Sequence, residues 1–116
     1  MNQVLPLPEA DGVEGQCQTF NAMVRYDLTS GSYQRYDYGD GIYGSEAPIA
    51  PVHGATPDTD ESEAYSMTFT VNTRDWSSEC LVFEAKEIRE PIARVKIPRR
   101  ISIGFHATWV PGSQLW

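Results

Sequence analysis

The residue with the clearest capacity for chemistry is His106, in the run GFH at residues 104–106 of this 116-residue chain. Side chains alternate between the two faces of a strand, so His106 would share its face with Gly104 and Thr108. The missing side chain of Gly104 would leave room for a metal ion or a substrate beside the imidazole. The alternative is a structural histidine, hydrogen-bonded in a core or at a surface, and spacing alone favours this alternative.

Glu46 is the second candidate, and it lies in a stretch rich in glycine and proline at residues 39–62, which we expect to be a long loop. A metal-bound histidine needs its other ring N–H held, and a carboxylate can do this while making the ligand more basic. A lone glutamate in such a loop is more often solvated, and the spacing does not decide between these roles. His53, in the same stretch, is expected to be an exposed loop residue.

Composition and charge exclude several classes of function. The formal net charge is -7, which argues against binding a nucleic acid through its phosphates. An acidic cluster at residues 58–63 is followed by a basic stretch at residues 86–100, and we interpret both as solvated surfaces. Contact of the basic stretch with an anionic lipid surface is the weaker alternative. Cys17 and Cys80 lack the spacing of a zinc site, so two free thiols are expected.

The chain contains no apolar run that could span a membrane as a helix, which takes about 20 residues. Its first ten residues, 1–10, lack the basic and apolar regions of a secretory signal. The sequence therefore predicts no transmembrane segment and a cytoplasmic location, unless a longer parent protein carries a signal that this chain lacks.

The alternation of apolar and polar residues predicts an all-β chain of about six short strands. The expected strands are residues 22–28 and 33–38, which form a hairpin, and residues 65–72, 79–84, 92–97 and 101–110. The run 79–84 has four consecutive apolar residues, as expected of a strand buried on both faces. Residues 1–19 are expected to be an irregular lead-in. Such strands are typical of a sandwich, a barrel or propeller blades, and no internal repeat chooses among these.

Four motifs occur in order, with ordinary spacing, between residues 20 and 110. They are FNAMVRYDLTSG (20–31), YGSEAP (43–48), SECLVFEA (78–85), and IARVKIPRR (92–100) followed by GFH. Together they resemble the corresponding motifs of the carotenoid cleavage oxygenase family. This family includes carotenoid, apocarotenoid and lignostilbene dioxygenases and the visual-cycle isomerase.

The resemblance implies a seven-bladed β-propeller with Fe(II) on its axis, held by four histidines that three glutamates orient. His106 matches the last of the four histidines, and Glu46 matches the last of the three glutamates. Enzymes of this family cleave a conjugated C=C bond with O2, so the implied partners include a hydrophobic conjugated small molecule. Residues 20–116 would form the propeller portion of this chain.

The chain departs from the family in length, because members are several times longer, and it has only two histidines. We therefore expect the C-terminal blade or blades of an incomplete propeller, from a larger enzyme, a truncated reading frame or a split gene product. The missing N-terminal blades would supply the remaining iron ligands. The alternative is a non-catalytic β-rich remnant or interaction module without metal.

Overall fold

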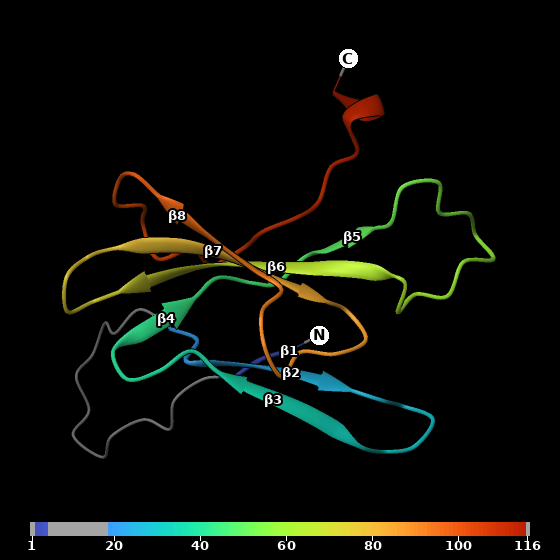
Figure 1. Ribbon diagram of the computed structural model, residues 1–116, viewed down its shortest axis with the longest axis horizontal. Coiled ribbons are helices and arrows are strands. Elements are labelled where there is room, and N and C mark those ends of the chain that lie inside the picture. Colours follow the sequence, from blue (N-terminus) through green and yellow to red (C-terminus); the bar gives the residue numbers. More distant parts are fainter. Residues whose placement is uncertain (1, 5–18, 116) are drawn as a thin grey trace.

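A computed structural model describes residues 2–4 and 19–115, which form two antiparallel β-sheets (Figure 1). The first sheet has the order β1 (Asn2–Val4), β2 (Ala22–Tyr26), β3 (Tyr33–Asp37). The second sheet has the order β4 (Ile42–Gly44), β6 (Ala64–Asn72), β7 (Ser78–Glu84), β8 (Ala93–Ile97), and β5 (Ile49–Pro51) also pairs with β6. A short 3-10 helix, η1 (Gly112–Gln114), lies near the C-terminal end. The predicted all-β class is confirmed for the described residues.

The predicted hairpin is confirmed by β2 and β3, which pair from Ala22 with Asp37 to Tyr26 with Tyr33. Asp27 closes the turn, because its Oδ1 accepts hydrogen bonds from the backbone N–H groups of Thr29 and Ser30. A carboxylate that accepts two N–H groups in this way stabilises the turn without any contact from the second sheet.

The expected long loop at residues 39–62 is interrupted by β4 and β5, so this prediction is wrong in part. Both strands have only three residues, and both pair with the nine-residue strand β6. Prolines and glycines keep these strands short, but short strands at a sheet edge tolerate them. The remaining loop carries His53, which is exposed in a turn as predicted.

The expected strand at residues 101–110 is wrong, because this segment has no regular secondary structure. It leaves the second sheet after β8 and becomes the C-terminal arm of the molecule (Figure 1). The N–H of Ile101 donates to Ser78 Oγ at 3.3 Å, a side-chain contact rather than a ladder bond. Alternation in sequence does not provide a partner strand, and a β-strand needs one.

The predicted irregular lead-in differs at residues 2–4, which form β1 and pair with β2. The other residues of that prediction, 1 and 5–18 with Cys17 among them, lie outside the described residues.

The core lies between the two sheets and contains Met23, Tyr38, Leu81, Phe83 and Ile88. Each of these side chains is at most 7% exposed. Ile88 belongs to the β7–β8 connection, and its N–H donates to Gln34 Oε1 on the first sheet at 2.9 Å. The sheets are therefore joined both by apolar packing and by a hydrogen bond across the layers.

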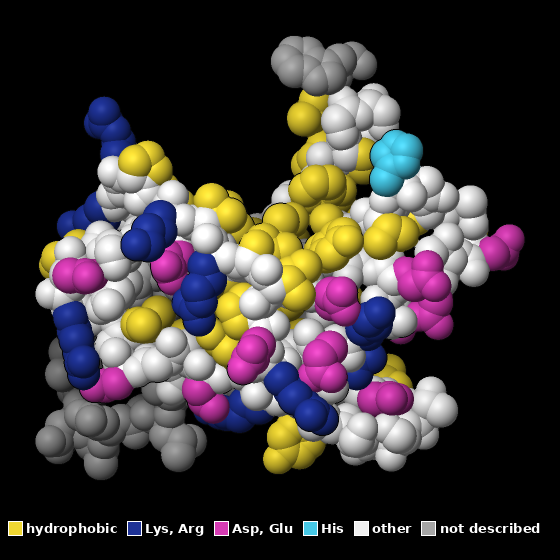
Figure 2. Space-filling view, viewed as in Figure 1, with side chains coloured by type: hydrophobic (Ala, Val, Ile, Leu, Met, Phe, Trp, Pro, Cys, Tyr) yellow, Lys and Arg dark blue, Asp and Glu magenta, His cyan; other side chains and the backbone are white. Residues whose placement is uncertain are grey.

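The long strand β6 buries three polar side chains and exposes two aromatic ones, whereas its Ala64 and Val71 are buried. Ser66, Thr68 and Thr70 are at most 3% exposed, whereas Tyr65 and Phe69 are 41% and 42% exposed. The outward row continues across β7, where Cys80 and Val82 are only partly buried, so the expected burial of β7 on both faces is wrong. Figure 2 shows hydrophobic side chains gathered in the hollow between the body of the molecule and the C-terminal arm.

Candidate functional site

The structure brings the two predicted site residues together, although they are 60 residues apart in sequence. The Nδ1 atom of His106 lies 3.1 Å from Glu46 Oε1. The second oxygen of the carboxylate, Oε2, accepts a hydrogen bond from the N–H of Ala107 at 3.0 Å. Both oxygens of Glu46 are thus used to hold the segment that carries His106.

This arrangement determines which nitrogen of the ring is available. An ionised carboxylate only accepts hydrogen bonds, so Nδ1 of His106 carries a hydrogen, and in the neutral form of the ring Nε2 keeps its lone pair. Within the described part of the chain, Nε2 makes no hydrogen bond. The side chain is 78% exposed, so this nitrogen is open to a ligand.

The pKa of Glu46 is lowered from its ordinary value, first by the N–H of Ala107 and second by the hydrogen bond from His106. A lowered carboxyl pKa keeps Glu46 ionised at neutral pH and preserves its role as an acceptor. The carboxylate is therefore a permanent partner for the imidazole N–H.

Ser45 positions Glu46, because Ser45 is 2% exposed and hydrogen-bonded to β6. The N–H of Ser45 donates to the carbonyl of Phe69 at 2.8 Å, and the N–H of Phe69 donates to Ser45 Oγ at 3.1 Å. Thr68 Oγ1 also donates to the carbonyl of Ser45 at 3.0 Å. The residue that precedes Glu46 is consequently held by both its main chain and its side chain.

The two residues before His106, Gly104 and Phe105, position it through contacts with other segments. Gly104 lies against Ser45, and a Cβ atom at Gly104 would come within 2.9 Å of Ser45 Cβ. The ring of Phe105 stacks on that of Phe20 with centroids 5.7 Å apart. The space at Gly104 is therefore filled by Ser45, and the prediction that it leaves room for a metal or substrate is wrong.

Three features that position the Glu46–His106 pair were not predicted from the sequence. They are the N–H of Ala107, the close approach of Ser45 and the ring of Phe20. A backbone N–H is present at every residue except proline, so nothing in the sequence marks the one at Ala107. Phe20 and Ser45 belong to motifs that were noticed, but no pattern indicated that these motifs meet the C-terminal segment.

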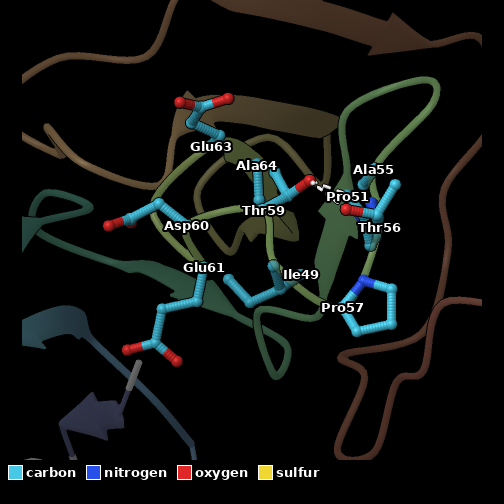
Figure 3. Close-up of a pocket in the computed structure, with 10 residues that line it drawn as sticks. All are labelled: Ile49, Pro51, Ala55, Thr56, Pro57, Thr59, Asp60, Glu61, Glu63 and Ala64. Atoms are coloured by element: carbon cyan, nitrogen blue, oxygen red, sulfur yellow. Dashed lines mark hydrogen bonds between the residues drawn. The ribbon is translucent and has the colours of Figure 1, made fainter.

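The acidic cluster does not form a metal site. An open pocket of about 360 Å³ lies under the β5–β6 loop and is lined by Asp60, Glu61 and Glu63 among others. Figure 3 shows these three carboxylates pointing in different directions. Across the described ranges 2–4 and 19–115, no group of three or more His, Cys, Asp or Glu side chains could hold a metal ion.

Three residues of the basic stretch pair with acidic residues at the surface, which agrees with its interpretation as a solvated face. The ion pairs are Lys86–Glu84, Arg89–Glu87 and Arg94–Glu79. Arg100 instead lies over the ring of Trp76, 4.1 Å from its centroid. Cys80 is a free thiol whose pKa is raised by burial, which makes it less reactive.

The fold of this chain matches segments of solved oxygenase structures. The chain superposes on a lignostilbene dioxygenase from Pseudomonas brassicacearum with a TM-score of 0.70 and 27% sequence identity. The match covers 81% of this chain and 19% of that chain. A variant of the apocarotenoid oxygenase from Synechocystis gives a TM-score of 0.70 at 20% identity, over 79% of this chain and 19% of that chain.

The family model described as "Retinal pigment epithelial membrane protein" matches residues 8–111. The chain therefore belongs to this family, the carotenoid cleavage oxygenases, as its four sequence motifs predicted.

Two curated relatives come from plants. The probable carotenoid cleavage dioxygenase 4 of Arabidopsis thaliana, a chloroplastic protein, is 30% identical over 95% of this chain. The carotenoid 9,10(9',10')-cleavage dioxygenase 1 of Pisum sativum is 38% identical over 69% of this chain. The matched regions make up only 18% and 15% of these relatives, so the chain spans less than a fifth of their length.

In the part of the chain that the structure describes, no helix has the length and apolar character needed to cross a membrane.

Proposed function

We propose that this chain supplies one histidine, with its carboxylate partner, to the iron site of a dioxygenase. The enzyme would cleave a conjugated C=C bond in a carotenoid, an apocarotenoid or a stilbene with O2. The chain would form the C-terminal blade or blades of a seven-bladed β-propeller. The observation that carries the proposal is the Glu46–His106 hydrogen bond, because it holds the imidazole at Nδ1 and leaves Nε2 open to a ligand.

The residues present fit one of the four histidine ligands of such an iron site, together with its carboxylate partner. His106 would bind Fe(II) through Nε2, while Glu46 holds the ring at Nδ1 and raises its basicity. A neutral imidazole brings no negative charge, so the ion stays cationic and electrophilic. Bound Fe(II) would supply the activation of O2.

The remaining ligands would come from polypeptide that this chain does not contain, and the outer face of the second sheet supports this. Phe69, Cys80 and Val95 lie opposite one another across β6, β7 and β8 on the face away from the core. Phe69 and Val95 are 42% and 53% exposed. An apolar row on three adjacent strands is suited to pack against another β-sheet, as neighbouring propeller blades do.

The substrate class is supported by the relatives, which are named as dioxygenases of carotenoids and of lignostilbene. These names cover both polyene and stilbene substrates, which share a conjugated double bond. A cytoplasmic location stays a prediction.

A chimaera tests the proposal. This chain would replace the matching segment of the lignostilbene dioxygenase, and bound iron and product formation would be measured. We expect the chimaera to bind iron and cleave its substrate, and His106→Ala to lose both. His53→Ala is the matched control, because His53 is an exposed turn residue and should not matter.

Full iron content and full activity in the His106→Ala chimaera would contradict the proposal. A folded chimaera without iron would support the alternative of a non-catalytic β-rich module.

A further inference from the structure

Gly104 and Ser45 approach each other more closely than two ordinary side chains allow. An added Cβ at Gly104 would lie 2.9 Å from Ser45 Cβ and 3.9 Å from its Cα. The backbone of Gly104 does not have the positive φ that favours glycine elsewhere, as at Gly31 with φ of 70°. Space, rather than backbone conformation, is therefore what requires glycine at this position.

Ser45 has little freedom to give way. It is 2% exposed, and its main chain and hydroxyl are hydrogen-bonded to Phe69 and Thr68 on β6. Its Oγ also donates to the carbonyl of Glu46 at 2.8 Å. An added methyl group at Gly104 would consequently displace the C-terminal segment rather than Ser45.

The other attachments of this segment follow the contact directly in sequence. The ring of the next residue, Phe105, stacks on Phe20. His106 Nδ1 and Ala107 N–H then reach the two oxygens of Glu46. Because Glu46 follows Ser45 directly, the distance between Gly104 and Ser45 sets how closely the histidine segment can approach the carboxylate.

We propose that Ser45 and Gly104 form a steric seat that positions His106 on Glu46. Both are positioning residues, since they act through the Glu46–His106 pair and not on a ligand. The role of His106 as an iron ligand rests on the function proposed above, but the seat itself needs no metal.

The test uses the 116-residue chain and the backbone amide of Ala107, followed by NMR. Glu46→Ala supplies the reference for a released amide. We expect Gly104→Ala to move the Ala107 resonance to the position seen in Glu46→Ala, and to raise its hydrogen-exchange rate roughly tenfold or more. Gly112→Ala is the matched control, because an added Cβ there meets nothing within 4 Å.

A second pair of variants separates the seat from general destabilisation. Ser45→Gly removes the atom that an alanine at Gly104 would meet, so Gly104→Ala should have no further effect on Ala107 in that background. An equal effect of Gly104→Ala in both backgrounds would overturn the proposal. So would an Ala107 amide that resonates alike in the wild type, Gly104→Ala and Glu46→Ala.

These readouts are independent of the iron proposal. If Gly104→Ala releases the Ala107 amide as expected but the chimaera binds no iron, the steric seat is supported and the proposed function is contradicted. The reverse pattern would remove the seat alone.

Discussion

At the scale of single residues, Glu46 makes two contacts with the segment that carries His106. One oxygen orients the ring of His106, and the other accepts the main-chain N–H of the next residue, Ala107. The second bond prevents the carboxylate from rotating away from the imidazole. A charged acceptor also strengthens both bonds, because hydrogen bonds to an ionised group are about twice as strong as neutral ones.

The first prediction concerns Glu46→Gln in the chimaera. Glutamine keeps the size of the side chain but removes the charge that makes the imidazole a better ligand. We expect iron affinity to fall by about 10- to 100-fold, measured by titration with Fe(II) under anaerobic conditions. Glu61→Gln, an exposed carboxylate in the β5–β6 loop, is the control. Equal affinities for both variants would argue against a role for Glu46 in orienting the ligand.

The second prediction concerns pH and the β2–β3 turn. The pKa of Asp27 is lowered, first by the N–H of Ser30 and then by that of Thr29. A carboxyl whose pKa is lower in the folded state stabilises the fold above its unfolded pKa, and this stabilisation disappears as the pH falls through the folded pKa.

Asp27→Ala should therefore be less stable than the wild type at about pH 7, and the difference should shrink towards about pH 2. Urea unfolding at both pH values measures it. Asp27→Asn keeps an acceptor oxygen and should lose less stability than Asp27→Ala. A difference that does not change with pH would show that the charge is not involved.

At the scale of the elements, β6 is the strand whose pattern was easiest to find and whose burial was hardest to infer. Alternation at residues 65–72 predicted the strand, and the structure has it at Ala64–Asn72. Alternation normally indicates apolar residues facing the core, but here Ser66, Thr68 and Thr70 face inward. The reversed burial follows from the position of the first sheet, which covers the polar side.

The third prediction tests this assignment of faces. Phe83 is fully buried and packs edge-on to Tyr36 with ring centroids 5.0 Å apart. Phe83→Ala should lower the free energy of unfolding by about 3–5 kcal/mol, because it leaves a cavity in the core. Phe69→Ala, on the outer face of the same sheet, should cost less than about 1 kcal/mol in the isolated chain. Equal losses in urea unfolding would contradict the assignment.

At the scale of the whole molecule, the described residues bury one face of the second sheet and leave much of the other open. The C-terminal segment covers one end of this outer face, where Ile101 donates to Ser78. The row Phe69, Cys80 and Val95, of which Phe69 and Val95 are exposed and Cys80 is partly buried, lies beyond that cover. An exposed apolar row of this kind is a surface for association, and it makes the outer face the place where a further β-sheet would pack.

The fourth prediction is that Phe69→Glu has a small effect in the isolated chain and a large one in the chimaera. In the isolated chain Phe69 is already 42% exposed, so the substitution should change the urea midpoint little. In the chimaera the charge would be buried against the neighbouring sheet, and the thermal unfolding temperature should fall by several degrees, about 2–4 °C for each kcal/mol lost. Leu28→Glu, 94% exposed at the β2–β3 turn, is the control.

An equally small effect of Phe69→Glu in both contexts would show that the outer face stays exposed in the assembled protein. A large effect in the isolated chain would instead show that this face is already covered there.

The sequence by itself determined the family, the all-β class and the existence of five strands, whose ends in the structure differ by one or two residues from most of the predicted ones. These features depend on short motifs and on local alternation, which are complete within a few residues. The sequence also selected His106 and Glu46, but only through resemblance, because spacing favoured a structural histidine.

Only the tertiary structure decided that Glu46 contacts His106 itself, that Ser45 fills the space at Gly104, and that residues 101–110 have no strand partner. Each of these depends on which distant segments meet, and Glu46 and Ala107 are 61 residues apart. Local patterns describe the preferences of a chain segment, whereas the space around His106 is created by packing between segments. In the sequence, Gly104 indicated open space beside His106, whereas in the structure Gly104 packs against Ser45 and so positions His106.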